Sequence, residues 1–141
     1  MRAFVLDASV ALAWFVDSPV PSYAAQVRDA MVSGKKALVP SLWVLEMANG
    51  LLMAERRGKL TAAEVDYGLS RLEIVAAQAI EVDAAAVPTI REAFAAAAYA
   101  HQLTAYDATY LELARREELP LATLDKSLRV AAGKAGIPAM S

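Results

Sequence analysis

Short apolar runs alternate along the chain with longer stretches in which apolar residues recur at helical spacing. Four of these runs predict buried strands, at Ala3–Leu6, Ala37–Val39, Ala79–Val82 and Leu121–Thr123. We expect Ile137 to begin a short last strand. The stretches between the runs predict helices at 9–16, 21–33, 42–57, 61–75, 84–100, 106–117 and 126–133.

The predicted strands are hydrophobic, instead of alternating between apolar and polar residues. Strands of this kind are typical of a parallel sheet that is covered by helices on both faces. We therefore expect an α/β fold: a three-layer α/β/α sandwich with a central parallel sheet and right-handed crossovers, in a single domain over residues 1–141. In such a sheet the ligand site lies beyond the carboxyl ends of the strands.

The composition argues against several classes of protein and several kinds of metal site. Hydrophobic residues make up 57% of the chain, which argues against disorder. The absence of cysteine excludes disulfides and thiolate metal sites, and a single histidine, His101, excludes a histidine-rich zinc site. The apolar stretch at the start is too short for a signal peptide, because Asp7 interrupts it, and no apolar stretch resembles a membrane span. We expect a cytoplasmic protein that does not bind membranes.

The formal net charge of −2 restricts the ways in which the chain could bind nucleic acid. Stoichiometric coating of nucleic acid usually needs a basic face, which this balance argues against. An enzyme that acts on nucleic acid remains compatible, because a bound divalent cation supplies positive charge locally. For Lys126, Arg129 and Lys134, contacts to phosphates compete with a solvated helix surface.

Aspartates follow two of the predicted strands. Asp7 ends the first apolar run, and Asp125 comes directly after Leu121–Thr123. Both positions point toward the crevice at the carboxyl ends of the strands. A helix follows each aspartate, so an N-cap role is the alternative for either residue alone.

Glu46 lies within the apolar helix predicted from Leu42 to Ala54. Glu46 and Asn49 are its only polar side chains, and their spacing places them on one face. A helix that is apolar nearly all round is expected to be buried, so its carboxylate needs a metal or a partner. The structural alternative is a salt bridge to an arginine such as Arg91.

Asp107 stands at the start of another predicted helix. Positions 107, 110, 111 and 114 form one stripe, whose other members are Tyr110, Leu111 and Ala114. Asp107 is therefore expected at the start of the buried face. A role in the first helical turn, which favours acidic residues, is the alternative.

Four converging carboxylates without histidine or cysteine suit hard cations, Mg²⁺ or Mn²⁺. In the absence of metal they repel one another, and some take up protons. A bound metal removes this cost, lowers the pKa of its water and stabilises charge on a phosphate. That chemistry hydrolyses phosphodiesters without a covalent nucleophile.

Four segments carry a resemblance to a known family. They are Val5–Ser9, Leu45–Asn49, Tyr106–Ala114 and Ala122–Asp125. In this order, and over nearly the whole chain, the sequence resembles the PIN-domain ribonucleases, and among them the VapC-type toxins of bacterial toxin–antitoxin pairs.

The resemblance implies the roles of particular residues. Asp7, Glu46, Asp107 and Asp125 would be the catalytic, metal-binding acids of a Mg²⁺-dependent endoribonuclease. Supporting polar groups would be Ser9, Asn49 and Thr123. The resemblance also implies an RNA substrate, a homodimer and an antitoxin protein that holds the toxin inactive.

Two other functions remain open at this point. One is a non-catalytic PIN-like module that binds RNA or protein, although intact acids at all four positions count against it. The other is a phosphoryl-transfer or receiver-type domain on a similar sheet. Such domains usually place further acids beside the aspartate of the first strand, where this chain has Ala8 and Ser9.

Overall fold

The computed structural model describes residues 2–85 and 87–141 of the chain and contains one parallel sheet. Its strands have the order β3-β2-β1-β4, and their bounds are β1 Arg2–Leu6, β2 Lys36–Val39, β3 Ile80–Val82 and β4 Leu121–Ala122. The predicted strands and their parallel arrangement are therefore confirmed. The expected last strand is reduced to a bridge between Leu121 and Ala139.

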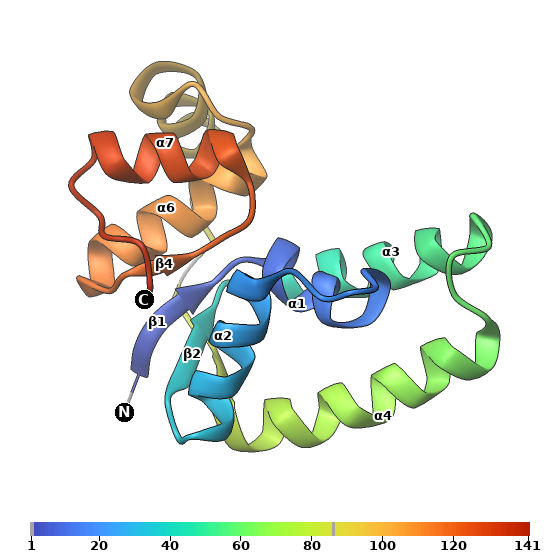
Figure 1. Cartoon of the computed structure of the whole chain (residues 1–141). Coiled ribbons are helices and arrows are strands. Elements are labelled where there is room, and N and C mark those ends of the chain that lie inside the picture. Colours follow the sequence, from blue (N-terminus) through green and yellow to red (C-terminus); the bar gives the residue numbers. More distant parts are fainter. Residues whose placement is uncertain (1, 86) are drawn as a thin grey trace.

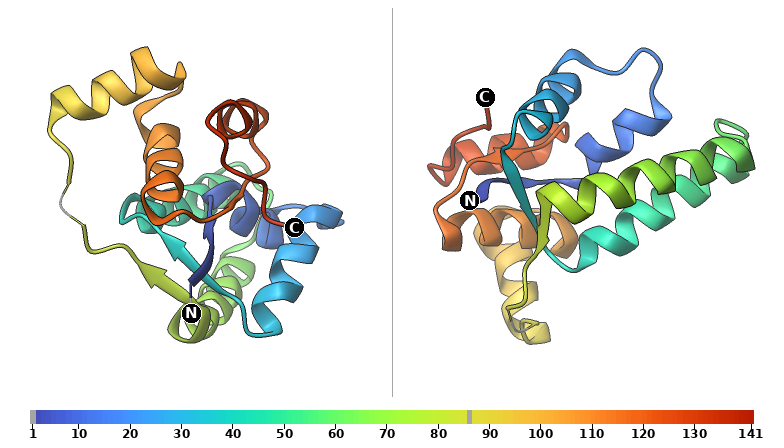
Figure 2. Two further views of the ribbon diagram at one scale, coloured as in Figure 1. Left: turned by 90° about the vertical axis from the view of Figure 1, so that its left-hand side faces the viewer. Right: turned by 90° about the horizontal axis from the view of Figure 1, so that it is seen from below.

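Helices connect and flank the strands (Figures 1 and 2). Their bounds are α1 Ala8–Val16, α2 Ser22–Val32, α3 Leu42–Arg56, α4 Ala62–Ala79, α5 Ile90–Ala95, the π-helix η1 Ala96–His101, α6 Ala105–Glu117 and α7 Lys126–Lys134. The α/β architecture, a central parallel sheet flanked by helices, agrees with the prediction. Within these described residues, no helix has the length and apolar character needed to cross a membrane.

The helix predicted over 84–100 was wrong in its first part. Helix α5 begins only at Ile90, because Thr89 and Glu92 form a capping box that defines the helix start. The hydroxyl of Thr89 accepts from the Glu92 amide, and the Glu92 carboxylate accepts from the Thr89 amide, each at 3.1 Å. Residue 86 of the predicted range lies outside the described residues.

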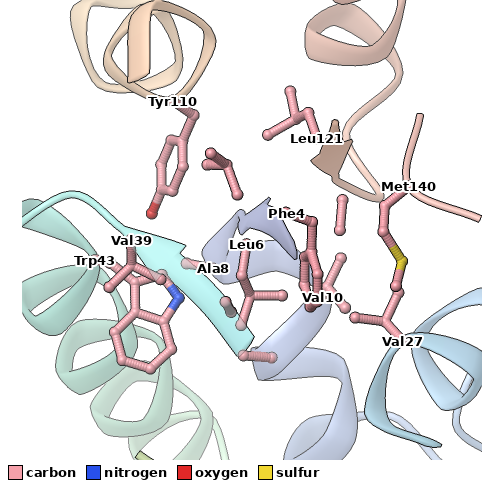
Figure 3. Close-up of a cluster of buried hydrophobic side chains, with 14 of the residues drawn as sticks. Phe4, Leu6, Ala8, Val10, Val27, Val39, Trp43, Tyr110, Leu121 and Met140 are labelled. Carbon is pink, nitrogen blue, oxygen red and sulfur yellow. The ribbon is translucent and has the colours of Figure 1, made fainter. Parts of the chain in front are cut away.

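The core surrounds β1, which lies between β2 and β4. Phe4, Val5 and Leu6 of this strand are fully buried. Tyr110 of α6 and Val27 of α2 approach β1 from opposite sides (Figure 3). Helices on both faces of the sheet explain why its central strand is apolar where it is buried, from Phe4 to Leu6.

Helices α3 and α4 form a hairpin that projects beyond the sheet (Figure 1). A Cβ atom at Gly50 of α3 would lie 2.5 Å from a methyl carbon of Leu12, and one at Gly68 of α4 would lie 3.0 Å from the ring of Phe15. Glycine at these positions therefore lets both helices pack closely against α1.

The expectation that the helix around Glu46 is buried on nearly all sides was wrong. As part of the projecting hairpin, α3 is covered along one side only, by α1 and α4. Its other side exposes Val44 at 50% and Leu45 at 72%. Large apolar side chains thus remain uncovered beside a candidate site residue.

Candidate active site

Asp7 directly follows β1 and is 4% exposed. Its Oδ2 atom accepts two hydrogen bonds, from Oγ of Ser9 at 2.6 Å and from Oγ1 of Thr123 at 2.7 Å. Although Asp7 occupies the N-cap position of α1, its side chain makes no capping hydrogen bond. The orientation of this carboxylate is therefore fixed by two hydroxyl groups and not by helix capping.

The same hydroxyls join the segments that follow β1 and β4. The amide of Leu124 donates to Oγ of Ser9 at 3.0 Å, and the amide of Asp125 donates to Oγ1 of Thr123 at 3.0 Å. Since each hydroxyl also donates to Asp7, the two strand ends are held in one hydrogen-bonded network. This network brings the carboxylates of Asp7 and Asp125 to the same edge of the sheet.

Asp125 caps α7, as one of its two interpretations predicts. Its Oδ1 atom accepts from the Leu128 amide at 2.9 Å. The cap does not exclude a second role, because Asp125 also repels Asp7 and Asp107 strongly enough to raise their pKa values.

The partner of Glu46 is a tyrosine, not an arginine. The hydroxyl of Tyr110 in α6 donates to Oε1 of Glu46 at 2.6 Å. The pKa of Tyr110 is held far above its usual range by burial and by this hydrogen bond, so the hydroxyl keeps its proton. The alternative of a salt bridge between Glu46 and Arg91 has no counterpart in the described residues.

Asp107 lies in the first turn of α6 but does not cap it. Thr104 is the cap, and its hydroxyl accepts from the backbone amide of Asp107 at 3.1 Å. The side chains of Tyr110, Leu111 and Ala114 are fully buried, which confirms the predicted inward stripe. Asp107 begins this stripe, with its carboxylate half-buried.

The pKa values of three acids are raised above their ordinary values. Burial is the main cause for Asp7, and repulsion from Asp125 adds to it, while the bonds from the two hydroxyls oppose the rise. Burial also raises the pKa of Glu46, with repulsion from Asp7 and Asp107 in addition. The pKa of Asp107 rises through burial and through repulsion from Asp125 and Asp7. The four predicted acids, from four separate segments, therefore form one electrostatic cluster.

Comparison with known proteins identifies the family. The sequence model of the PIN domain matches residues 4–134. This chain belongs to the PIN-domain family. PIN domains are typically nucleases.

Further comparisons agree with this PIN fold. The crystal structure of PAE2754 from Pyrobaculum aerophilum superposes with a TM-score of 0.67 at 23% sequence identity, over 92% of this chain and 86% of that chain. At this level of identity the likeness supports the fold alone. None of the curated proteins compared with the chain matches it.

The donor set of this PIN domain fits the ions that PIN nucleases usually use, Mg²⁺ and Mn²⁺. All four acids offer hard oxygen ligands, and burial together with mutual repulsion raises the pKa values of Asp7, Glu46 and Asp107. Over residues 2–85 and 87–141, no group of three or more acidic or histidine side chains is arranged as it stands to hold a metal ion. Asn49, predicted as a supporting group, is exposed one turn beyond Glu46.

Sequence reasoning did not find two polar contacts of the PIN site. Tyr110 was predicted only as a member of the buried stripe that Asp107 begins, and its spacing from Asp107 was the only signal that it could reach the site. Arg129 was considered for phosphate contacts. Its Nη2 instead donates to the carbonyl oxygen of Thr123 at 2.7 Å, and its guanidinium lies 5.5 Å from the ring centroid of Tyr23.

Proposed function

We propose that this PIN domain is a Mg²⁺-dependent endoribonuclease and the toxin of a type II toxin–antitoxin system. Mn²⁺ is the alternative ion. The observation that carries the proposal is the cluster of four mutually repelling carboxylates at the carboxyl edge of the parallel sheet. Such a cluster stores unfavourable charge that a hard divalent cation would neutralise.

Asp7, Glu46, Asp107 and Asp125 are the residues that would hold the ion. When bound, the ion supplies a water of lowered pKa and positive charge next to the scissile phosphate. The chain needs no covalent nucleophile for this reaction.

The remaining polar residues orient the acids. Ser9 and Thr123 bind the same oxygen of Asp7, which fixes how its carboxylate faces the crevice. Tyr110 of α6 orients the carboxylate of Glu46 in α3 through its hydrogen bond to Oε1. Groups of this kind set the geometry of ligands and are costly to remove.

An apolar groove supports the proposal of an antitoxin partner. It has a volume of about 520 Å³ and lies between α1, α2 and α4, where Trp14 and Phe15 line it. Arg28 and Arg71 line the same groove, and Arg71 lies over the ring of Tyr67. We propose that an acidic, amphipathic helix of the antitoxin binds here, with apolar residues in the groove and carboxylates on the arginines.

A homodimer is part of the same proposal. Uncovered apolar side chains on α3, at Val44 and Leu45, and on α5, at Ile90 and Phe94, support it. Isolated apolar side chains are ordinary on a protein surface, but several on one element are typical of a face that another molecule covers.

Cleavage of RNA tests the function. Wild-type protein incubated with a mixture of RNAs is expected to give fragments in Mg²⁺ and none with chelator. The variant Glu46→Gln, which keeps the acceptor for Tyr110 and loses the charge, is expected to be inactive in both. Cleavage that persists in chelator, or in this variant, would refute the metal-dependent nuclease.

Co-expression with the product of the neighbouring reading frame tests the toxin role, because an antitoxin should suppress cleavage and Arg71→Glu should weaken that suppression.

A further inference from the structure

We propose that the hollow between η1 and α7 is a second RNA-binding site, which takes one nucleotide of the strand that is cut at the four acids. The proposal rests on the nuclease function and adds to it a place where substrate is held away from the acids.

The hollow has the size and lining of a small-ligand site. Its volume is about 400 Å³, within the range usual for such sites. Tyr99, His101, Gln102 and Lys134 supply its polar and aromatic side chains, over a floor of small residues that includes Ala131. Among the described residues no carboxylate lines it, although the chain as a whole carries a net charge of −2.

Each of these side chains suits one part of a nucleotide. The ring of Tyr99 is 78% exposed and offers a surface on which a base can stack. The amide of Gln102 can donate to and accept from a base edge. The ammonium of Lys134 can pair with a phosphate, and it takes part in no ion pair with the described residues.

One wall of the hollow is held in place by contacts behind it. Nε2 of His101 lies 3.0 Å from Oε1 of Glu112, and the other oxygen of Glu112 accepts from Arg115 at 2.8 Å. Tyr99 packs against Phe94 with ring centroids 5.5 Å apart and the planes at 73°. The lining is thus preorganised, which reduces the entropy lost when a ligand binds.

The backbone of the same wall is irregular. Residues 96–101 form a π-helix, and Gln102 ends it with a φ of 54° in the left-handed region. π-helical turns are often found at functional sites, and left-handed non-glycine residues have a conformational cost that the fold must offset. Here both features direct the chain around the hollow.

Both walls lead to the acid cluster. The wall formed by η1 continues through a short loop into α6, whose first turn carries Asp107. The other wall is α7, which is capped by Asp125 and ends at Lys134, about 13 Å away along the helix axis at 1.5 Å per residue. A strand a few nucleotides long could therefore contact the acids and the hollow together.

Substrate length provides the test. Cleavage of single-stranded RNAs in Mg²⁺ is measured from the dinucleotide upward, for wild type, Tyr99→Ala and Lys134→Ala. We expect each variant to raise KM for the longer RNAs roughly tenfold, with kcat unchanged, because stacking and phosphate contacts away from the acids contribute to binding. Dinucleotide cleavage should be unaffected. For Lys134→Ala, the slope of log affinity against log salt should also fall in magnitude by about 0.7.

The hairpin of α3 and α4, away from the hollow, provides matched controls. Leu69 is an exposed apolar residue of α4, and Lys59 follows the end of α3. Leu69→Ala and Lys59→Ala should leave KM unchanged at every length. If wild type cleaves RNA while the variants of the hollow behave like these controls, the second site is wrong and the nuclease stands. If the variants impair dinucleotides as much as longer RNAs, a separate site is also wrong. If wild type cleaves no RNA in Mg²⁺, the proposed function itself fails.

Discussion

The hydroxyl of Tyr110 donates a hydrogen bond of 2.6 Å to Oε1 of Glu46, a residue 64 positions earlier in the chain. Tyr110 is fully buried, and its ring extends from α6 toward the start of α3 (Figure 3). The bond lowers the pKa of Glu46 against the effects of burial and of neighbouring acids. Tyr110 thus helps to keep Glu46 ionised and in place.

Replacing Tyr110 by phenylalanine removes this bond and little else. Because Glu46 loses the donor that lowers its pKa, the variant should bind Mg²⁺ roughly tenfold to a hundredfold more weakly, the usual cost of losing a group that orients a metal ligand. Loss of one hydrogen bond should also lower the free energy of unfolding by about 1 kcal/mol. Thermal melting over a Mg²⁺ titration measures both effects. Tyr67→Phe is the control, since this tyrosine is 66% exposed, and equal Mg²⁺ responses in the two variants would contradict the role of Tyr110.

Thr123→Val tests the hydroxyl network in a similar way. Valine nearly preserves the shape of threonine but cannot donate to Asp7 or accept from the amide of Asp125. Mg²⁺ affinity and the rate of RNA cleavage should both fall, and Thr123→Ser should restore most of each because it returns the hydroxyl. A serine variant as impaired as the valine variant would show that packing, not the hydroxyl, is what matters at this buried position.

The sequence predicted the sheet and the four acids because both depend on local signals. Apolar runs define the strands, and Asp7 and Asp125 follow two of them at the parallel edge. It could not assign partners across long separations. Nothing near Glu46 indicates Tyr110, and nothing near Asp7 indicates Thr123. The start of α5 was missed because the alanine-rich stretch concealed the capping box at Thr89, and the exposure of α3 was missed because periodicity does not show which neighbours cover a helix.

The exposed face of α3 predicts self-association. Light scattering at micromolar concentration should give twice the 15.0 kDa mass of one chain. Leu45→Glu places a charge on this face and should shift the mass toward the monomer, because a buried unpaired charge opposes association. Val130→Glu is the control, since Val130 of α7 is likewise 50% exposed. A monomeric wild type, or equal effects of both substitutions, would remove α3 as the interface.

Amide variants of the acids separate capping from metal binding. Asp7→Asn, Asp107→Asn, Asp125→Asn and Glu46→Gln should each abolish RNA cleavage while preserving the fold. In chelator each variant should be at least as stable as wild type, since one repelling charge is gone, and asparagine caps α7 about as well as aspartate at position 125. Mg²⁺ should stabilise each variant less than wild type, because stabilisation follows affinity for the folded state. Variants that keep both cleavage and the full Mg²⁺ shift would refute the cluster.

The dependence of stability on pH should reveal the raised pKa values of these acids. Folding raises the pKa values of Asp7, Glu46 and Asp107, so near those values the folded chain binds more protons than the unfolded chain. Stability in chelator should therefore decrease as pH rises from the ordinary values of 3.8 and 4.5 through the raised ones, with no further loss above them. Other acids act in the opposite direction, since hydrogen bonds lower the pKa of Glu64 and of Glu92.

Taking the difference between wild type and Glu46→Gln removes the contribution of those other acids, because both proteins contain them. In chelator, the free energy of unfolding of wild type should fall relative to the variant as pH rises, because only wild type must ionise Glu46 in its partly buried position beside Asp7 and Asp107. In saturating Mg²⁺ the sign should reverse, since deprotonated acids bind the ion and wild type gains more from it as pH rises. Urea denaturation of both proteins over this pH range, with Mg²⁺ and with chelator, measures the two differences. A difference in chelator that does not change with pH would mean that neither burial nor the neighbouring acids raise the pKa of Glu46, and the four acids would then not act as one site.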